Sequence, residues 1–172
     1  MKRIGTISYR KSWFIVANFI FFLVLGIIMI VATGIVPVSA AGALWFILCI
    51  LLYMLLHEGL HLLFMRIFSG EKLRVSLEFP TISIGSDALF NRMQFIRIAL
   101  APAVILGIIL LWLLFCIPEG YQLLLAVLLI LNLAGSGGDF LQAYCALKYP
   151  SDSFFRDDSN ETAVYIKWRN VH

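Results

Sequence analysis

Four long apolar blocks constrain the fold of this chain more than any other feature of its sequence. They run roughly over residues 13–36, 43–68, 98–117 and 121–149. A helix needs about 20 mostly apolar residues to cross the hydrocarbon layer of a membrane, and each block is long enough. The chain is 62% hydrophobic and 13% charged, whereas soluble domains are about one quarter charged. The sequence therefore predicts an α-helical polytopic membrane protein with four transmembrane helices in one core, residues 1–149.

A secretory signal peptide is the alternative for the first block. Basic residues precede this block, and "VPVSAAGA" at its end resembles a cleavage site. The apolar core of a signal peptide, however, is only about 7–15 residues long. The block over residues 13–36 is longer, so we expect a retained span.

The basic residues predict an orientation in the membrane. All 13 lysines and arginines lie in three groups: four before the first block, five from the end of the second block (Arg66) to the start of the third, and four from the end of the fourth block (Lys148) onward. The short loops on the other side carry none. By the positive-inside rule, both termini are cytosolic in a multi-pass protein of the cell membrane, surrounded by the lipid bilayer. This topology accounts for the net charge of +3, which therefore indicates no nucleic-acid partner.

The segment over residues 69–97 is the largest break in hydrophobicity. Within it, "LRVSLEF" and "TISIG" alternate between apolar and polar residues, and Pro80 separates them. Alternation of this kind is typical of strands, and proline favours a turn. We expect a short β-hairpin at the cytosolic membrane surface. Residues 150–172 are polar and begin with a proline, so they are expected to form a cytosolic tail.

His57, Glu58 and His61 spell H-E-x-x-H inside the second block. On a helix the two histidines lie one turn apart on one face, so both imidazoles can bind one metal ion, and Glu58 can take a proton from a metal-bound water. An ionisable group inside a span costs about 2.5–3.5 kcal/mol on insertion scales, so it indicates a function. A polar cluster that only packs helices together is the alternative.

A zinc hydrolase uses three protein ligands and leaves one position for water. Asp139 is the acidic residue that lies deep inside another block. The second and fourth blocks run in the same direction, and at about 1.5 Å per residue His57 and Asp139 come to similar depths. Glu78 and Asp87 in the inner segment are the alternatives, and each needs a loop that folds back.

The residues around Asp139 favour an interrupted helix. Each glycine in "GSGG", residues 135–138, costs up to about 1 kcal/mol in a helix interior. Membrane helices break only where protein or water meets the exposed backbone, so the break could admit water. Close packing of helices through Ala134 and Gly138 is an equal alternative. Asn132 could bind a substrate backbone, or it could join two helices.

These motifs resemble the intramembrane zinc metalloproteases of the site-2 protease type, and most closely a compact bacterial group of putative zincin peptidases. The likeness covers roughly residues 43–149 and is carried by "HEGLH", "ALAPAVI" and "NLAGSGGD". It implies that His57, His61 and Asp139 bind Zn²⁺, that Glu58 is the general base, and that the hairpin presents substrate as an added strand. An ordinary amphipathic surface hairpin is an equal alternative for the last of these. The chain departs from the site-2 pattern because a proline is missing before Asp139 and Phe140 follows it.

The sequence thus predicts a zinc metalloendopeptidase that hydrolyses membrane-embedded or membrane-adjacent protein substrates near the cytosolic face. A lapsed protease that binds metal or peptide, as a regulator or immunity factor, is the alternative. A metal transporter is disfavoured because the first and third blocks contain no His, Asp or Glu. The ligand set also suits iron, but the built-in base of H-E-x-x-H favours zinc. The sequence indicates neither the substrate nor the oligomeric state.

Overall fold

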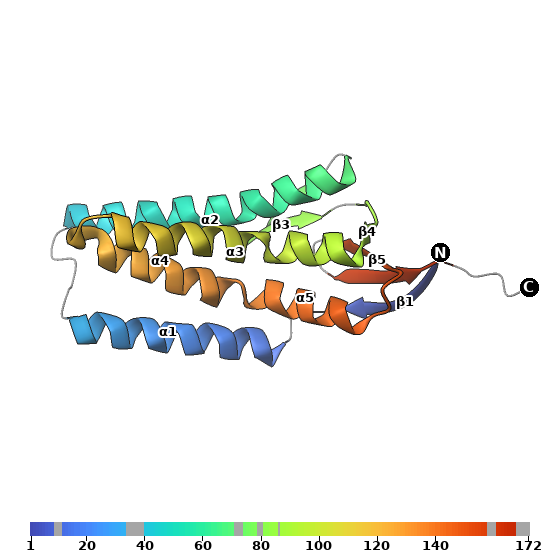
Figure 1. Ribbon diagram of the computed structural model, residues 1–172, viewed down its shortest axis with the longest axis horizontal. Coiled ribbons are helices and arrows are strands. Elements are labelled where there is room, and N and C mark those ends of the chain that lie inside the picture. Colours follow the sequence, from blue (N-terminus) through green and yellow to red (C-terminus); the bar gives the residue numbers. More distant parts are fainter. Residues whose placement is uncertain are drawn as a thin grey trace, which may run out of the picture. The chain divides into compact units, whose positions relative to one another are not determined.

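The computed structural model describes residues 1–8, 12–33, 40–70, 74–78, 81–85, 87–157 and 161–167. The elements follow one another along the chain (Figure 1) as β1 (Lys2–Ile7), α1 (Trp13–Thr33), α2 (Ala40–Ser69), β2 (Arg74–Glu78), β3 (Thr81–Gly85), β4 (Phe90–Asn91), α3 (Arg92–Cys116), the short 3₁₀ helix η1 (Glu119–Tyr121), α4 (Gln122–Gly135), α5 (Gly137–Lys148), β5 (Ser153–Asp157) and β6 (Thr162–Ile166).

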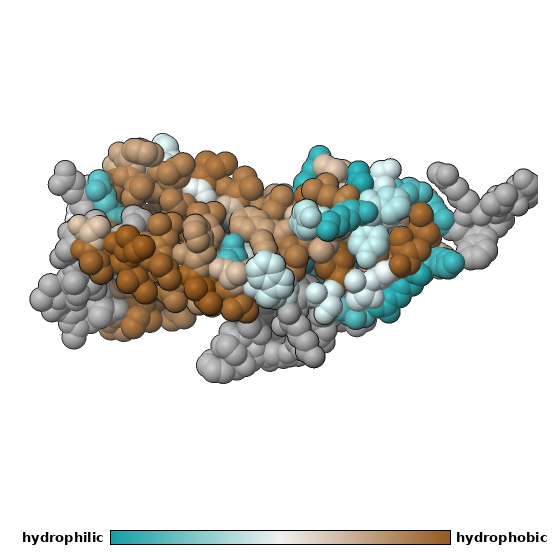
Figure 2. Space-filling view, turned by 90° about the horizontal axis from the view of Figure 1, so that it is seen from below, coloured by the Kyte–Doolittle hydropathy of each residue, from teal (hydrophilic) through white to brown (hydrophobic). Residues whose placement is uncertain are grey.

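These elements form two compact units. The first, here called the helix unit, comprises Trp13–His57 and Pro102–Gly137. The second, the sheet unit, comprises Met1–Ser12, Glu58–Ala101 and Gly138–His172. Figure 2 shows mostly hydrophobic residues on the helices and hydrophilic residues gathered over the sheet unit.

Helices occupy all four blocks that the sequence predicts as spans. α2, over Leu44–Ser69, and α3 are each long and apolar enough to cross a membrane. α4 and α5 are bent by 41° and count as one further span if the pair is taken together. In α1, the stretch Trp13–Ile28 is apolar but shorter than the two candidate spans. The described residues therefore give two or three candidate spans, and a fourth crossing by α1 stays a prediction.

The strands form two antiparallel sheets. β2 and β3 pair with each other, from Arg74 opposite Gly85 to Glu78 opposite Thr81, so the predicted hairpin is confirmed. Its turn at Pro80 lies outside the described residues. The second sheet has the order β1-β6-β5-β4 and joins the start of the chain to residues 153–166. The sequence analysis did not predict this four-stranded sheet.

Buried aromatic rings fill the core of the sheet unit. Phe90, Phe95 and Phe155 are each about 1% exposed or less, and Phe95 of α3 stacks on Phe155 of β5 with ring centroids 4.8 Å apart. Met65 of α2 and Ala146 of α5 belong to the same buried cluster. The core therefore holds together the parts of α2, α3 and α5 that lie within this unit.

Truncation of Phe155 to alanine should lower the free energy of unfolding by about 3–5 kcal/mol, because it leaves a cavity where a fully buried ring stacked. Denaturant unfolding of the purified protein in detergent measures this. Phe115→Ala is the matched control, since that ring is 81% exposed on α3, and surface changes cost about 0.5 kcal/mol or less. Equal losses in the two variants would contradict the role of this core.

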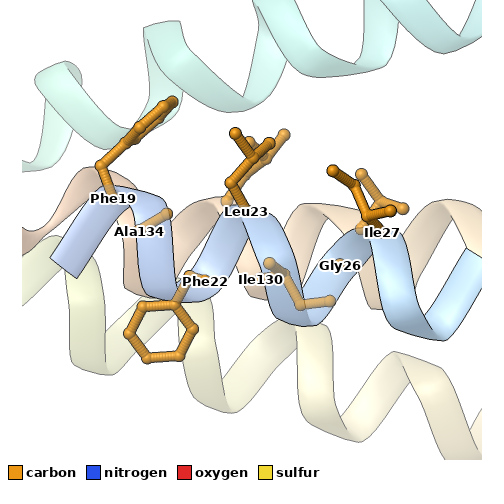
Figure 3. A pocket seen from close by; sticks show the side chains of 9 residues that line it. Phe19, Phe22, Leu23, Gly26, Ile27, Ile130 and Ala134 are labelled. Atoms are coloured by element: carbon orange, nitrogen blue, oxygen red, sulfur yellow. The ribbon is translucent and has the colours of Figure 1, made fainter. Parts of the chain in front are cut away.

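In the helix unit, α1 packs along α4. Figure 3 shows Phe19, Leu23 and Ile27 on one side of α1, at the four-residue spacing that places side chains on one helix face. They line a small pocket together with apolar residues of α4, among them Ile130 and Ala134. An apolar pocket of this kind has no group that binds a metal or a peptide backbone, so the candidate site lies elsewhere.

Candidate metal centre

His57 and His61 lie on the continuous helix α2. Because they are four residues apart, the helix places both imidazoles on the same face, one turn from each other. His57 is 8% exposed, and the side chain of His61 is 14% exposed. The Nδ1 atom of His61 lies 3.0 Å from the backbone carbonyl oxygen of Ile98 on α3. A carbonyl only accepts hydrogen bonds, so Nδ1 of His61 donates and its Nε2 atom is left to bind a metal.

Asp139 lies in the first turn of α5, just after the break between α4 and α5. A carboxylate is favourable there because the start of a helix carries partial positive charge. Its Oδ1 atom is 3.3 Å from the Nε2 atom of His61, within the sheet unit. The predicted interruption of the fourth block is present, and Asp139, just after it, lies beside the Nε2 atom of His61.

The candidate ligand atoms of His57, His61 and Asp139 all lie within 4.8 Å of one another. Two imidazoles and a carboxylate are a donor set that zinc binds. Ligand atoms at about 2.0–2.1 Å from one tetrahedral ion lie about 3.3 Å apart. The separation of His61 and Asp139 already has this value, and the ligand atoms of all three residues lie close enough together for one zinc ion to bind them.

The other predicted site residues take different places. Glu58 is partly buried on α2, next to His57, and is not part of the three-residue group. Asp87 is among the described residues and is not part of this group either. The side chain of Glu78 is not described.

Asn132 is fully buried, and both ends of its amide are engaged. Its Oδ1 atom accepts a hydrogen bond from the Tyr53 hydroxyl on α2, at 3.0 Å. Its Nδ2 atom donates to the carbonyl oxygen of Ala103 on α3, at 2.8 Å. This arrangement favours the alternative that Asn132 joins helices over a direct contact with a substrate.

Asn18 of α1 holds the end of α4, a role that the sequence analysis missed. Its Nδ2 atom donates to the carbonyl oxygens of Leu133 and Ala134, at 3.0 and 2.9 Å. The last four carbonyls of a helix have no partner inside it, so this amide satisfies two of them. A Cβ atom on Gly137 would lie 2.8 Å from the same nitrogen. Glycine at position 137 therefore lets Asn18 approach the point where α5 begins.

Loss of this contact should destabilise the protein. Asn18→Ala removes the hydrogen bonds to two part-buried carbonyls and should cost about 1–3 kcal/mol in unfolding free energy. Gly137→Ala should have a similar effect, because its methyl group displaces the amide. The double variant should be little worse than either single one, since both remove the same contact. Denaturant unfolding in detergent measures all three, and additive losses would show that the two residues act separately.

Comparison with known proteins gives one family. Residues 50–154, more than half of the chain, match the model of a family described as "Putative zincin peptidase". The matched range contains both histidines, Glu58 and Asp139. No curated protein and no solved structure matches the chain.

Proposed function

The chain belongs to the putative zincin peptidase family, and from this premise we propose that it is an intramembrane zinc metalloprotease of the H-E-x-x-H type. It hydrolyses peptide bonds of membrane-embedded or membrane-adjacent proteins near the cytosolic face. The observation that carries the proposal is the group of His57, His61 and Asp139. The two histidines lie on α2, which is long and apolar enough to cross a membrane, and Asp139 lies on the bent pair α4 and α5, which counts as a further span if taken together. We also propose that the chain is similar to the site-2 proteases.

In this mechanism His57, His61 and Asp139 would hold Zn²⁺. When bound, zinc would supply a Lewis acid that polarises the scissile carbonyl and lowers the pKa of water toward neutral pH. Glu58 follows His57 on the same helix, and we assign its carboxylate the role of general base. It accepts a proton from the attacking water and then donates it to the leaving amine.

Substrate and water must both reach a centre within apolar helices. Backbone that leaves the helical hydrogen-bond pattern inside a membrane is tolerated only where protein or water meets it, so the break after Gly135 suits an entry for water. The β2–β3 hairpin suits a substrate peptide that binds as an added strand. Among the described strands these two pair only with each other, so each can add a peptide strand at its other edge. An added strand is extended, which exposes the peptide bond to be cut.

Metal content tests the ligand set first. The wild-type protein, purified in detergent and supplied with zinc, should retain about one zinc per chain, as a three-ligand site predicts. His57→Ala and Asp139→Ala should each lose most of it. Elemental mass spectrometry of the dialysed proteins measures the content. Zinc lost from His57→Ala alone would exclude Asp139 as a ligand, and a wild-type protein without metal would favour the lapsed-protease alternative.

Glu58→Gln should abolish proteolysis but leave zinc bound. General acid–base catalysis contributes about 10²–10⁴-fold, so the cleavage rate should fall by that factor. The assay follows cleavage of a panel of tagged single-span membrane proteins, each reconstituted with the enzyme in liposomes, by mass spectrometry of the products. Glu161→Gln is the matched control, because this glutamate pairs with Arg3 at an exposed position. Full activity of Glu58→Gln would overturn the proposed mechanism.

A further inference from the structure

A chain of buried hydrogen bonds leads away from His57. Its Nδ1 atom lies 3.2 Å from the Tyr53 hydroxyl, one turn earlier on α2. The Tyr53 hydroxyl donates to Oδ1 of Asn132 on α4, and Nδ2 of Asn132 donates to the carbonyl of Ala103 on α3. His57 and Tyr53 are each 8% exposed, and Asn132 is fully buried. We call Tyr53 and Asn132 the relay pair.

The direction of every hydrogen bond in this chain follows from its far end. The Ala103 carbonyl can only accept, so the nitrogen of the Asn132 amide must face it and the oxygen must face Tyr53. The Tyr53 hydroxyl has one proton, which it gives to that oxygen. It can then only accept a hydrogen bond from His57. Nδ1 of His57 therefore carries a proton, so Nε2 is the ring nitrogen that can offer a lone pair to a metal.

We propose that Tyr53 and Asn132 are positioning residues that hold His57 in this one tautomer and ring orientation, so that its Nε2 atom is ready to bind the metal. This inference rests on the proposed function, because it assigns the relay pair to the same zinc centre. A hydrogen bond to the second nitrogen of a ligating histidine fixes its tautomer and raises its basicity. His61 has the same support from a backbone carbonyl, that of Ile98. His57 has it from the Tyr53 hydroxyl, whose direction is fixed by its hydrogen bond to Asn132.

The space around the relay pair supports a specific role for the amide. A Cβ atom on Gly107 of α3 would lie 3.2 Å from Nδ2 of Asn132. Glycine at this position leaves the amide room to reach Ala103. A leucine in place of Asn132 could pack helices in an apolar surrounding, but it could not accept the proton of Tyr53.

Nitrogen NMR of histidine tests the tautomer without any metal. The chain has only three histidines, so ¹⁵N-histidine labelling gives few signals, which His57→Ala and His61→Ala assign. In metal-free wild type at about pH 8, above the usual histidine pKa, His57 should show a protonated Nδ1 and an unprotonated Nε2. In Tyr53→Phe the His57 signals should change to a mixture of tautomers, while those of His61 stay the same. Unchanged His57 signals in Tyr53→Phe would overturn the proposal.

Zinc affinity gives the second readout. Tyr53→Phe keeps the ring and should weaken zinc binding about 10–100-fold, the usual effect of losing such a partner. Asn132→Ala should weaken it similarly, and the double variant should be little worse. Tyr144→Phe is the matched control, since Tyr144 is 56% exposed on α5 and should leave the affinity unchanged. Competition with a chromophoric chelator measures all four.

The two readouts separate this proposal from the proposed function. Wild type that binds zinc, with an unchanged affinity in a folded Tyr53→Phe, would overturn the relay and leave the zinc centre standing. A wild-type protein that binds no zinc would overturn the zinc centre. The NMR signals of His57 would still show whether Tyr53 and Asn132 fix its tautomer. A purely structural role for Tyr53 would lower the unfolding free energy without moving either the tautomer or the affinity.

Discussion

The need to satisfy polar groups inside apolar helices governs how this protein is built. A polar group left without a hydrogen bond in such surroundings costs several kcal/mol. His61 meets this need with a backbone carbonyl of α3, and Asn132 joins α4 to both α2 and α3. Asn18 of α1 does the same for the end of α4. His61, Asn132 and Asn18 thus each join one helix to another.

The sheet unit adds a second constraint of a different kind. Its stacked rings, Phe95 on Phe155, bury an aromatic surface between a helix and a strand. The energy of such apolar burial depends less on direction than the energy of a hydrogen bond does. Precision at His61 and Asp139 therefore has to come from the polar contacts. The apolar core supplies most of the free energy that keeps α2, α3 and α5 together. The hydrogen bonds select which atoms face one another.

Local patterns allowed part of this to be predicted. Helical spacing identifies His57 and His61, the depth along two parallel blocks leads to Asp139, and alternation predicts the β2–β3 hairpin. The four-stranded sheet was missed because it pairs Lys2–Ile7 with Thr162–Ile166, and no local pattern links segments so far apart. Tyr53 was missed for a similar reason. It reads as one more apolar residue of a leucine-rich helix until Asn132, on another helix, is brought to its hydroxyl.

The break before Asp139 shows that a helix can be interrupted without proline. The sequence lacks the proline that the site-2 pattern would place before Asp139; proline interrupts a helix because it lacks an N–H group and crowds the preceding turn. Here that proline is absent, and "GSGG" with Asn18 takes its place. The glycines lower the cost of leaving the helix, and the amide of Asn18 satisfies the carbonyls that the break exposes. The missing proline is therefore no argument against an interrupted helix in this chain, because α1 supplies the hydrogen bonds that the break requires.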